Sequence, residues 1–72
     1  MSSVKVGDTN AGYRVIAVKK GTIENLSIVL AENVSDPAKY VVWAFDGLRF
    51  KNGIYRSDRE KAQQAYNSRN DY

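Results

Sequence analysis

The chain contains no histidine and no cysteine among its 72 residues. Nucleophilic triads, thiolate chemistry and the usual zinc sites need one of these side chains, and histidine is the default general base near neutral pH. No glycine-rich phosphate loop is present either, because no Gly-Lys-Ser/Thr follows Gly47 or Gly53. The sequence therefore predicts a protein that is not an enzyme and that holds no metal and no cofactor.

Carboxylates are the remaining groups that could do acid–base chemistry, and they are scattered along the chain. Most fall at predicted turns or at the start of a predicted helix, where acidic residues have local backbone roles. A chain this short has little room to enclose a carboxylate pair away from water. The eight carboxylates are Asp8, Glu24, Glu32, Asp36, Asp46, Asp58, Glu60 and Asp71.

The net charge of +3 is concentrated in residues 49–61, and the rest of the chain is neutral overall. Basic side chains next to an aromatic residue, here Tyr55, are typical of surfaces that bind nucleic acid. Nearby acidic residues dilute the charge, so a solvated mixed-charge face is the alternative interpretation. The candidate basic patch consists of Arg49, Lys51, Arg56 and Arg59.

The elements that position these residues are three strands and a helix. Tyr13–Lys19, Ile23–Glu32 and Tyr40–Phe45 are rich in β-branched and aromatic residues and favour strands. Asp46-Gly47 and Asn52-Gly53 are both hairpin dipeptides, and we expect one to form a tight turn and the other a looser bend.

Ser57-Asp58-Arg59-Glu60 has the pattern of a capping box and predicts a helix over residues 57–69. Its apolar stripe is thin, with only two alanines and a tyrosine. We therefore predict a single α+β domain spanning residues 1–72, with a small antiparallel sheet over about 4–56 and the helix after it. The sheet has three to five strands in chain order, a meander; the alternative is an SH3-like barrel with an appended helix.

The predicted strands alternate poorly, so that both faces of the sheet remain apolar, whereas one thin helix can cover only one of them. Either another chain covers the second face, or the sheet curls and buries that face itself. The first possibility predicts a homodimer, or a monomer that completes itself on a host partner. The candidate contact face is Tyr13, Val15, Tyr40 and Val42.

Without cysteine there are no disulfides, which indicates a reducing compartment and hence the cytoplasm. No apolar stretch approaches the length of a membrane span, so no membrane partner is expected.

Residues 40–69 resemble small uncharacterised bacterial and bacteriophage (mobile-element) proteins. The resemblance is carried by Tyr40-Val41-Val42-Trp43, by Asn52-Gly53-Ile54-Tyr55 and by the helix from Ala62 to Arg69. It implies a phage or mobile-element origin and, by analogy, a non-catalytic module that binds or inhibits a host protein. The alternative is a small nucleic-acid-binding protein that uses the basic segment 49–61.

Overall fold

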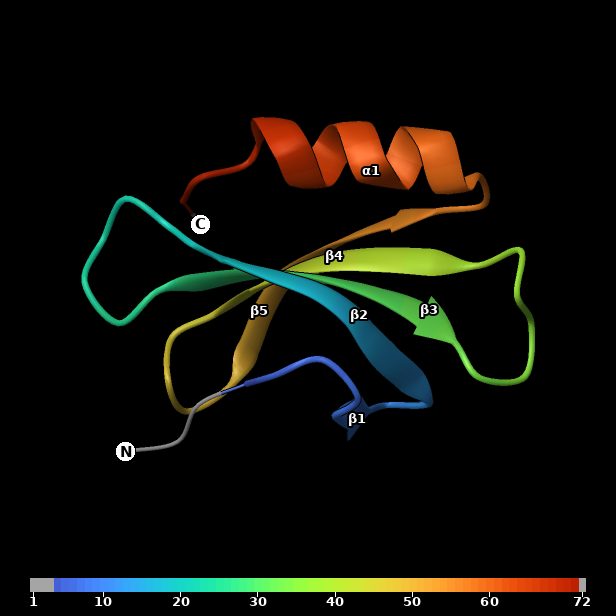
Figure 1. Cartoon of the computed structure of the whole chain (residues 1–72), viewed down its shortest axis with the longest axis horizontal. Helices are drawn as coiled ribbons and strands as arrows, with labels where there is room; N and C mark the ends of the chain where they lie inside the picture. The colour runs from blue at the N-terminus through green and yellow to red at the C-terminus, as the bar shows by residue number, and fades with distance from the viewer. Residues whose placement is uncertain (1–3, 72) are drawn as a thin grey trace.

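A computed structural model describes residues 4–71 and shows five strands followed by one helix (Figure 1). The sheet order is β1-β2-β3-β4-β5, and each strand pairs antiparallel with the next, so the sheet is a meander. This confirms the predicted α+β architecture. The elements are β1 (Thr9–Asn10), β2 (Tyr13–Lys20), β3 (Ser27–Asn33), β4 (Tyr40–Phe45), β5 (Phe50–Arg56) and α1 (Arg59–Ser68).

The sheet is curled into a half-barrel, with β1 and β5 as its two edges, and does not form the alternative SH3-like barrel. The curl brings together the side chains of Tyr13 on β2 and Tyr55 on β5, although two strands lie between them. The strands themselves would be about 14 Å apart in a flat sheet, and the two rings meet across the inner face with their centroids 6.1 Å apart. The curl therefore turns one face of the sheet inward on itself.

The helix-side core forms where α1 packs on one face of the sheet, which we call the outer face (Figure 1). Ala62 and Tyr66 contribute the buried side chains of α1. The small alanine allows the helix to approach the sheet closely, as its thin stripe requires. The buried members of this core are Leu26, Ile28, Leu30, Val42, Ala44, Ala62 and Tyr66.

The second core lies on the inner face and is closed by the chain itself. Val4 and Phe50 pack against it, and Gly7 N–H donates to the Val15 carbonyl at 2.9 Å, which fixes the N-terminal segment across this face. The buried members are Val15, Val29, Ala31, Val41, Trp43 and Phe45, all at most 7% exposed. Of the two possibilities for the apolar second face, the structure therefore shows the curled sheet.

The sequence left open which strand residues face the helix. In the structure Leu30 pairs with Val42 across the sheet, and both lie in the helix-side core. Directly opposed residues share a face, so the even-numbered residues of β3 and β4 lie together. The register depends on the β3–β4 loop, and a shift of one residue exchanges the faces.

The strands alternate poorly because both faces of the sheet are buried, and a β-bulge adds a further irregularity in β2 and in β5. In β2, Ile16 is the extra residue between the pairs Val15–Ala31 and Ala17–Leu30, so Ile16 and Ala17 both pack against the helix-side core. A bulge inserts one residue and increases the bend of the strand. The bulge therefore adds to the curl of the sheet.

Of the two glycine dipeptides, Asp46-Gly47 forms the turn between β4 and β5, with Gly47 at a φ of 97°. Asn52-Gly53 lies within β5 and forms the second bulge, with Asn52 at a φ of 51°. A Cβ at position 53 would lie 3.0 Å from the Trp43 indole nitrogen. Glycine at 53 therefore lets the tryptophan lie against the backbone.

Two boundaries differ from the predictions. The residues from Ile23 to Leu26 form a loop closed by a Gly21 N–H bond to the Leu26 carbonyl, so β3 begins only at Ser27. The helix is capped by Asp58, whose carboxylate accepts from Glu60 N–H at 2.8 Å. The predicted capping by Ser57 is therefore wrong by one residue, because Asp58 competes for the same role.

Candidate functional site

The predicted contact face of Tyr13, Val15, Tyr40 and Val42 does not exist as one surface. Val15 is 1% exposed and belongs to the inner core, whereas Val42 is 0% exposed and belongs to the helix-side core. The prediction failed because each residue's face was assigned with the wrong register and without the bulge in β2. Tyr13 and Tyr40 alone keep exposed surface.

The candidate basic patch is divided between the two ends of β5. Arg49 and Lys51 lie at its start, while Arg56 and Arg59 lie at and beyond its end. At about 3.3 Å per residue, the two pairs are separated by roughly 15 Å of strand. They therefore form two separate sites.

Asp46 pairs with the cation at the start of β5. The Lys51 ammonium lies 2.9 Å from the Asp46 carboxylate, which also accepts from the backbone N–H groups of Leu48 and Arg49 at 2.9 Å each. The bond from Lys51, followed by those from Arg49 and Leu48, holds the pKa of Asp46 well below its usual range. The charged groups at this end of β5 therefore stabilise the turn between β4 and β5.

The other end of β5 borders an open cleft of about 420 Å³. It contains three tyrosine rings and two cationic side chains, and no acidic residue lines it. Tyr13 and Tyr40 of the predicted contact face and Arg56 of the candidate basic patch thus meet in this cleft. We call it the tyrosine–cation cleft; its lining is Tyr13, Lys39, Tyr40, Tyr55, Arg56 and Ser57.

The meander places these residues together, because β2 and β4 begin at the end of the sheet where β5 finishes. Tyr40 pairs directly with Arg56 across β4 and β5. Tyr13 packs edge-on against Trp43 of the inner core, with ring centroids 5.6 Å apart. Tyr13 is therefore anchored on the inner core, whereas Tyr40 packs against the helix-side core. Tyr55 is 59% exposed.

Arg56, which lines the cleft, and Arg59, which lies beside Tyr40, are positioned by contacts other than ion pairs. Arg56 donates to the Tyr55 carbonyl at 2.8 Å, and the Arg59 guanidinium lies 5.9 Å from the centroid of the Tyr40 ring. Within residues 4–71, no salt bridge joins either arginine to a carboxylate. Lys39 approaches Asp36 only at 4.0 Å, and both are solvent-accessible. The charges of the cleft remain available to a ligand.

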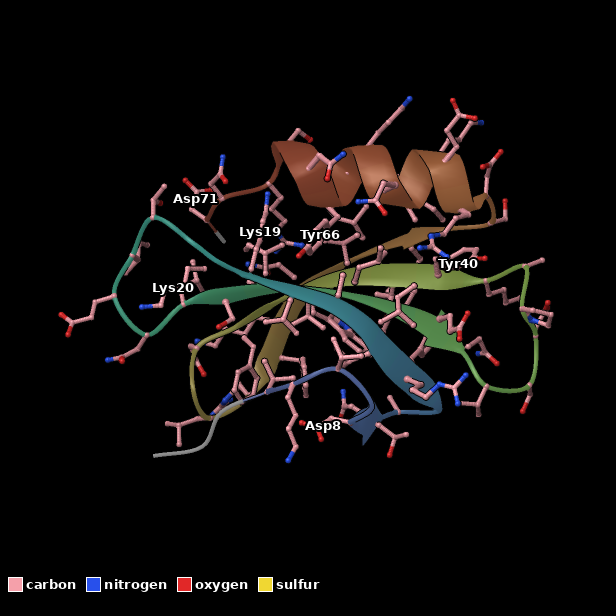
Figure 2. All side chains as sticks on the ribbon, in the orientation of Figure 1. Asp8, Lys19, Lys20, Tyr40, Tyr66 and Asp71 are labelled. Atoms are coloured by element: carbon pink, nitrogen blue, oxygen red, sulfur yellow. The ribbon has the colours of Figure 1, made fainter. Side chains whose placement is uncertain are left out.

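A second hollow of about 440 Å³ lies at the opposite end of the molecule, around the β2–β3 loop (Figure 2). Lys20 borders it, whereas Tyr40 marks the end with the tyrosine–cation cleft (Figure 2). Backbone and uncharged loop residues supply most of its lining, and Glu24 offsets Lys20. Its one aromatic lining residue is the buried Phe45, and its charges are of both signs, unlike those of the cleft.

Arg69 was predicted only as part of the helix, but it has a structural role. Its guanidinium donates to the carbonyl groups of Val42 and Asn52 at 2.9 and 2.7 Å, where the bulge in β5 interrupts the ladder. Partial burial lowers the pKa of Arg69 from its usual value. Arg69 thus ties the C-terminal segment to the bulge.

Sequence reasoning did not assign Lys39, Tyr55 and Ser57 to a binding site. Tyr55 was noted beside the basic residues, and its position in β5 opposite Val41 places it on the inner-face side of the sheet. In residues 4–71, no group of three metal-ligating side chains comes together, and no helix is long and apolar enough to cross a membrane.

Comparison with protein-family models, curated proteins and solved structures gives no match for this chain. The resemblance to bacteriophage proteins, and the origin it implies, therefore stay predictions.

Proposed function

We propose that the protein is a non-catalytic binding module and that the tyrosine–cation cleft contacts a negatively charged partner. The observation that supports this proposal is the lining of the cleft, where three tyrosines and the cations of Lys39 and Arg56 meet without a carboxylate. Arg59 adds a third cation beside Tyr40. Such a surface attracts an anionic partner by charge complementarity and offers flat apolar area for contact.

This proposal differs from the leading sequence-based interpretation. A self-associating or host-binding protein was favoured because a whole face of the sheet lacked a cover. Since the chain covers both faces itself, that argument no longer supports a homodimer. A phage or mobile-element protein that inhibits a host protein in the cytoplasm remains a proposal of the same class, with an acidic protein as the partner.

The proposal is tested by titrating the protein with two anionic probes at low salt, an octaglutamate peptide and an eight-nucleotide oligothymidine, while NMR spectra are recorded. We expect shifts at Tyr55 and Arg56 with at least one probe. Arg56→Ala should weaken that binding about two- to fivefold, the range that one exposed ion pair supplies.

Lys20→Ala is the matched control, because it removes one exposed cation at the opposite end of the molecule. It should leave the affinity unchanged within error. Absence of binding to both probes, or equal loss in the two variants, would contradict the proposal.

A further inference from the structure

We propose that the partner of the tyrosine–cation cleft is single-stranded nucleic acid; this inference rests on the proposed function. A single strand presents two chemistries in alternation, phosphate anions and flat unstacked bases. Proteins that bind it without sequence preference combine a basic groove with aromatic side chains on which bases stack. The cleft supplies both kinds of group within one small surface.

The aromatic component is the exposed Tyr55 ring. Its centroid is 6.1 Å from that of Tyr13, and the two planes are tilted by 60°. Tyr13 in turn contacts the buried Trp43, so this row of rings is anchored in the inner core. A stacking surface of this kind is rigid before the ligand arrives, which lowers the entropic cost of binding.

The cationic component lies at the same end of the sheet as these rings. Arg56 follows Tyr55 directly in β5, and its bond to the Tyr55 carbonyl places its guanidinium at the end of the strand. Arg59 covers Tyr40 from the first turn of α1. Guanidinium groups bind phosphate oxygens through several donors at once, and they also stack on bases.

Two other anionic partners fit the cleft less well. In a duplex the faces of the bases are already stacked on one another, so the exposed Tyr55 ring would find no free base on which to stack. An acidic peptide would satisfy the cations but has no need of an exposed ring such as Tyr55. The combination of rings and cations is what selects the single strand.

The test uses the full chain and a labelled eight-nucleotide oligothymidine, with fluorescence anisotropy as the readout. Tyr55→Leu removes the ring, whereas Tyr55→Phe keeps it. Since Tyr55 is 59% exposed, both variants should fold. We expect Tyr55→Leu to weaken binding about tenfold and Tyr55→Phe to change it less than twofold.

Salt dependence measures the phosphate contacts separately. For three cations, the logarithm of the affinity should fall with the logarithm of salt concentration with a slope of about −2. Arg56→Ala should make that slope shallower by about 0.7.

The outcomes distinguish the two proposals. Tighter binding of an octaglutamate peptide than of the oligonucleotide would overturn the nucleic-acid inference while leaving the anion-binding module intact. Equal oligonucleotide affinity of Tyr55→Leu and wild type would also overturn it, because the ring would then not contact a base. Absence of binding to either probe would overturn both proposals.

Discussion

Val42→Asp tests whether Val42 belongs to the core or to a contact surface. Val42 is 0% exposed in the middle of β4, under the helix and opposite Leu30. Losing a buried valine side chain costs about 1.5–3 kcal/mol, and burying an unpaired carboxylate costs several kcal/mol more. A domain of this size has only about 3–5 kcal/mol of stability in all. The variant should therefore be unfolded at 25 °C.

Val34→Asp is the matched control, because Val34 is 58% exposed in the loop between β3 and β4. The same substitution there should change the free energy of unfolding by no more than about 0.5 kcal/mol. Val42→Ala provides a graded variant that still folds. Two lost methyl groups and a small cavity cost about 2 kcal/mol, which lowers Tm by about 8–16 °C for a domain of this length.

Circular dichroism melting curves, with light scattering on the same samples, measure both the fold and the oligomeric state. If Val42→Asp remained folded, with a Tm near that of wild type, Val42 could not be core. A change from dimer to monomer with retained structure would instead restore the contact-surface interpretation. Unfolding of both valine-to-aspartate variants would mean that the chain does not tolerate the substitution anywhere.

Three further predictions concern the turn and the bulge. Arg69→Ala leaves two carbonyl groups at the bulge without their donor, and should lower the free energy of unfolding in urea by about 1.5–3 kcal/mol, whereas the exposed Lys61→Ala should have little effect. Gly53→Ala places a methyl group 3.0 Å from the indole nitrogen of Trp43, so the indole emission should shift and Tm should fall. The folded protein holds the pKa of Asp46 far below 3.8, so ionised Asp46 stabilises the fold above pH 4, and this contribution is lost as the pH falls further. Asp46→Asn should therefore be less stable than wild type at pH 7 and should lose less stability on acidification. Acid titrations followed by circular dichroism measure both effects.

Local patterns in the sequence predicted the elements but not the packing between them. Tyr40–Phe45 and the helix were confirmed because their signals are local: a β-branched aromatic run, and an acidic start followed by spaced alanines. The register was not predictable, since it depends on the β3–β4 loop, where Asn33 accepts from the N–H groups of Ser35 and Asp36. The bulge in β5 was missed because Asn-Gly signals a hairpin turn as readily as a left-handed bulge residue. The bulge in β2 was missed because the apolar run Val15-Ile16-Ala17 contains no turn residue to mark it.

The tyrosine–cation cleft, by contrast, follows from the predicted meander once strand directions are considered. In an antiparallel meander, every second strand begins where its neighbours end, so Tyr13 and Tyr40, which open β2 and β4, must lie at the same end as Arg56, which closes β5. The sequence analysis grouped residues by the face of the sheet and so placed Tyr13 and Tyr40 in one surface and Arg56 in another. Grouping the same residues by the end of the sheet at which they lie brings them together. What topology cannot supply is the curl, which reduces the distance between Tyr13 and Tyr55 to that of neighbouring rings. The bulge at Ile16 increases the bend of β2 between Tyr13 and the far end of that strand and contributes to the curl. A local irregularity that made the strand hard to recognise therefore helps to assemble the proposed binding surface.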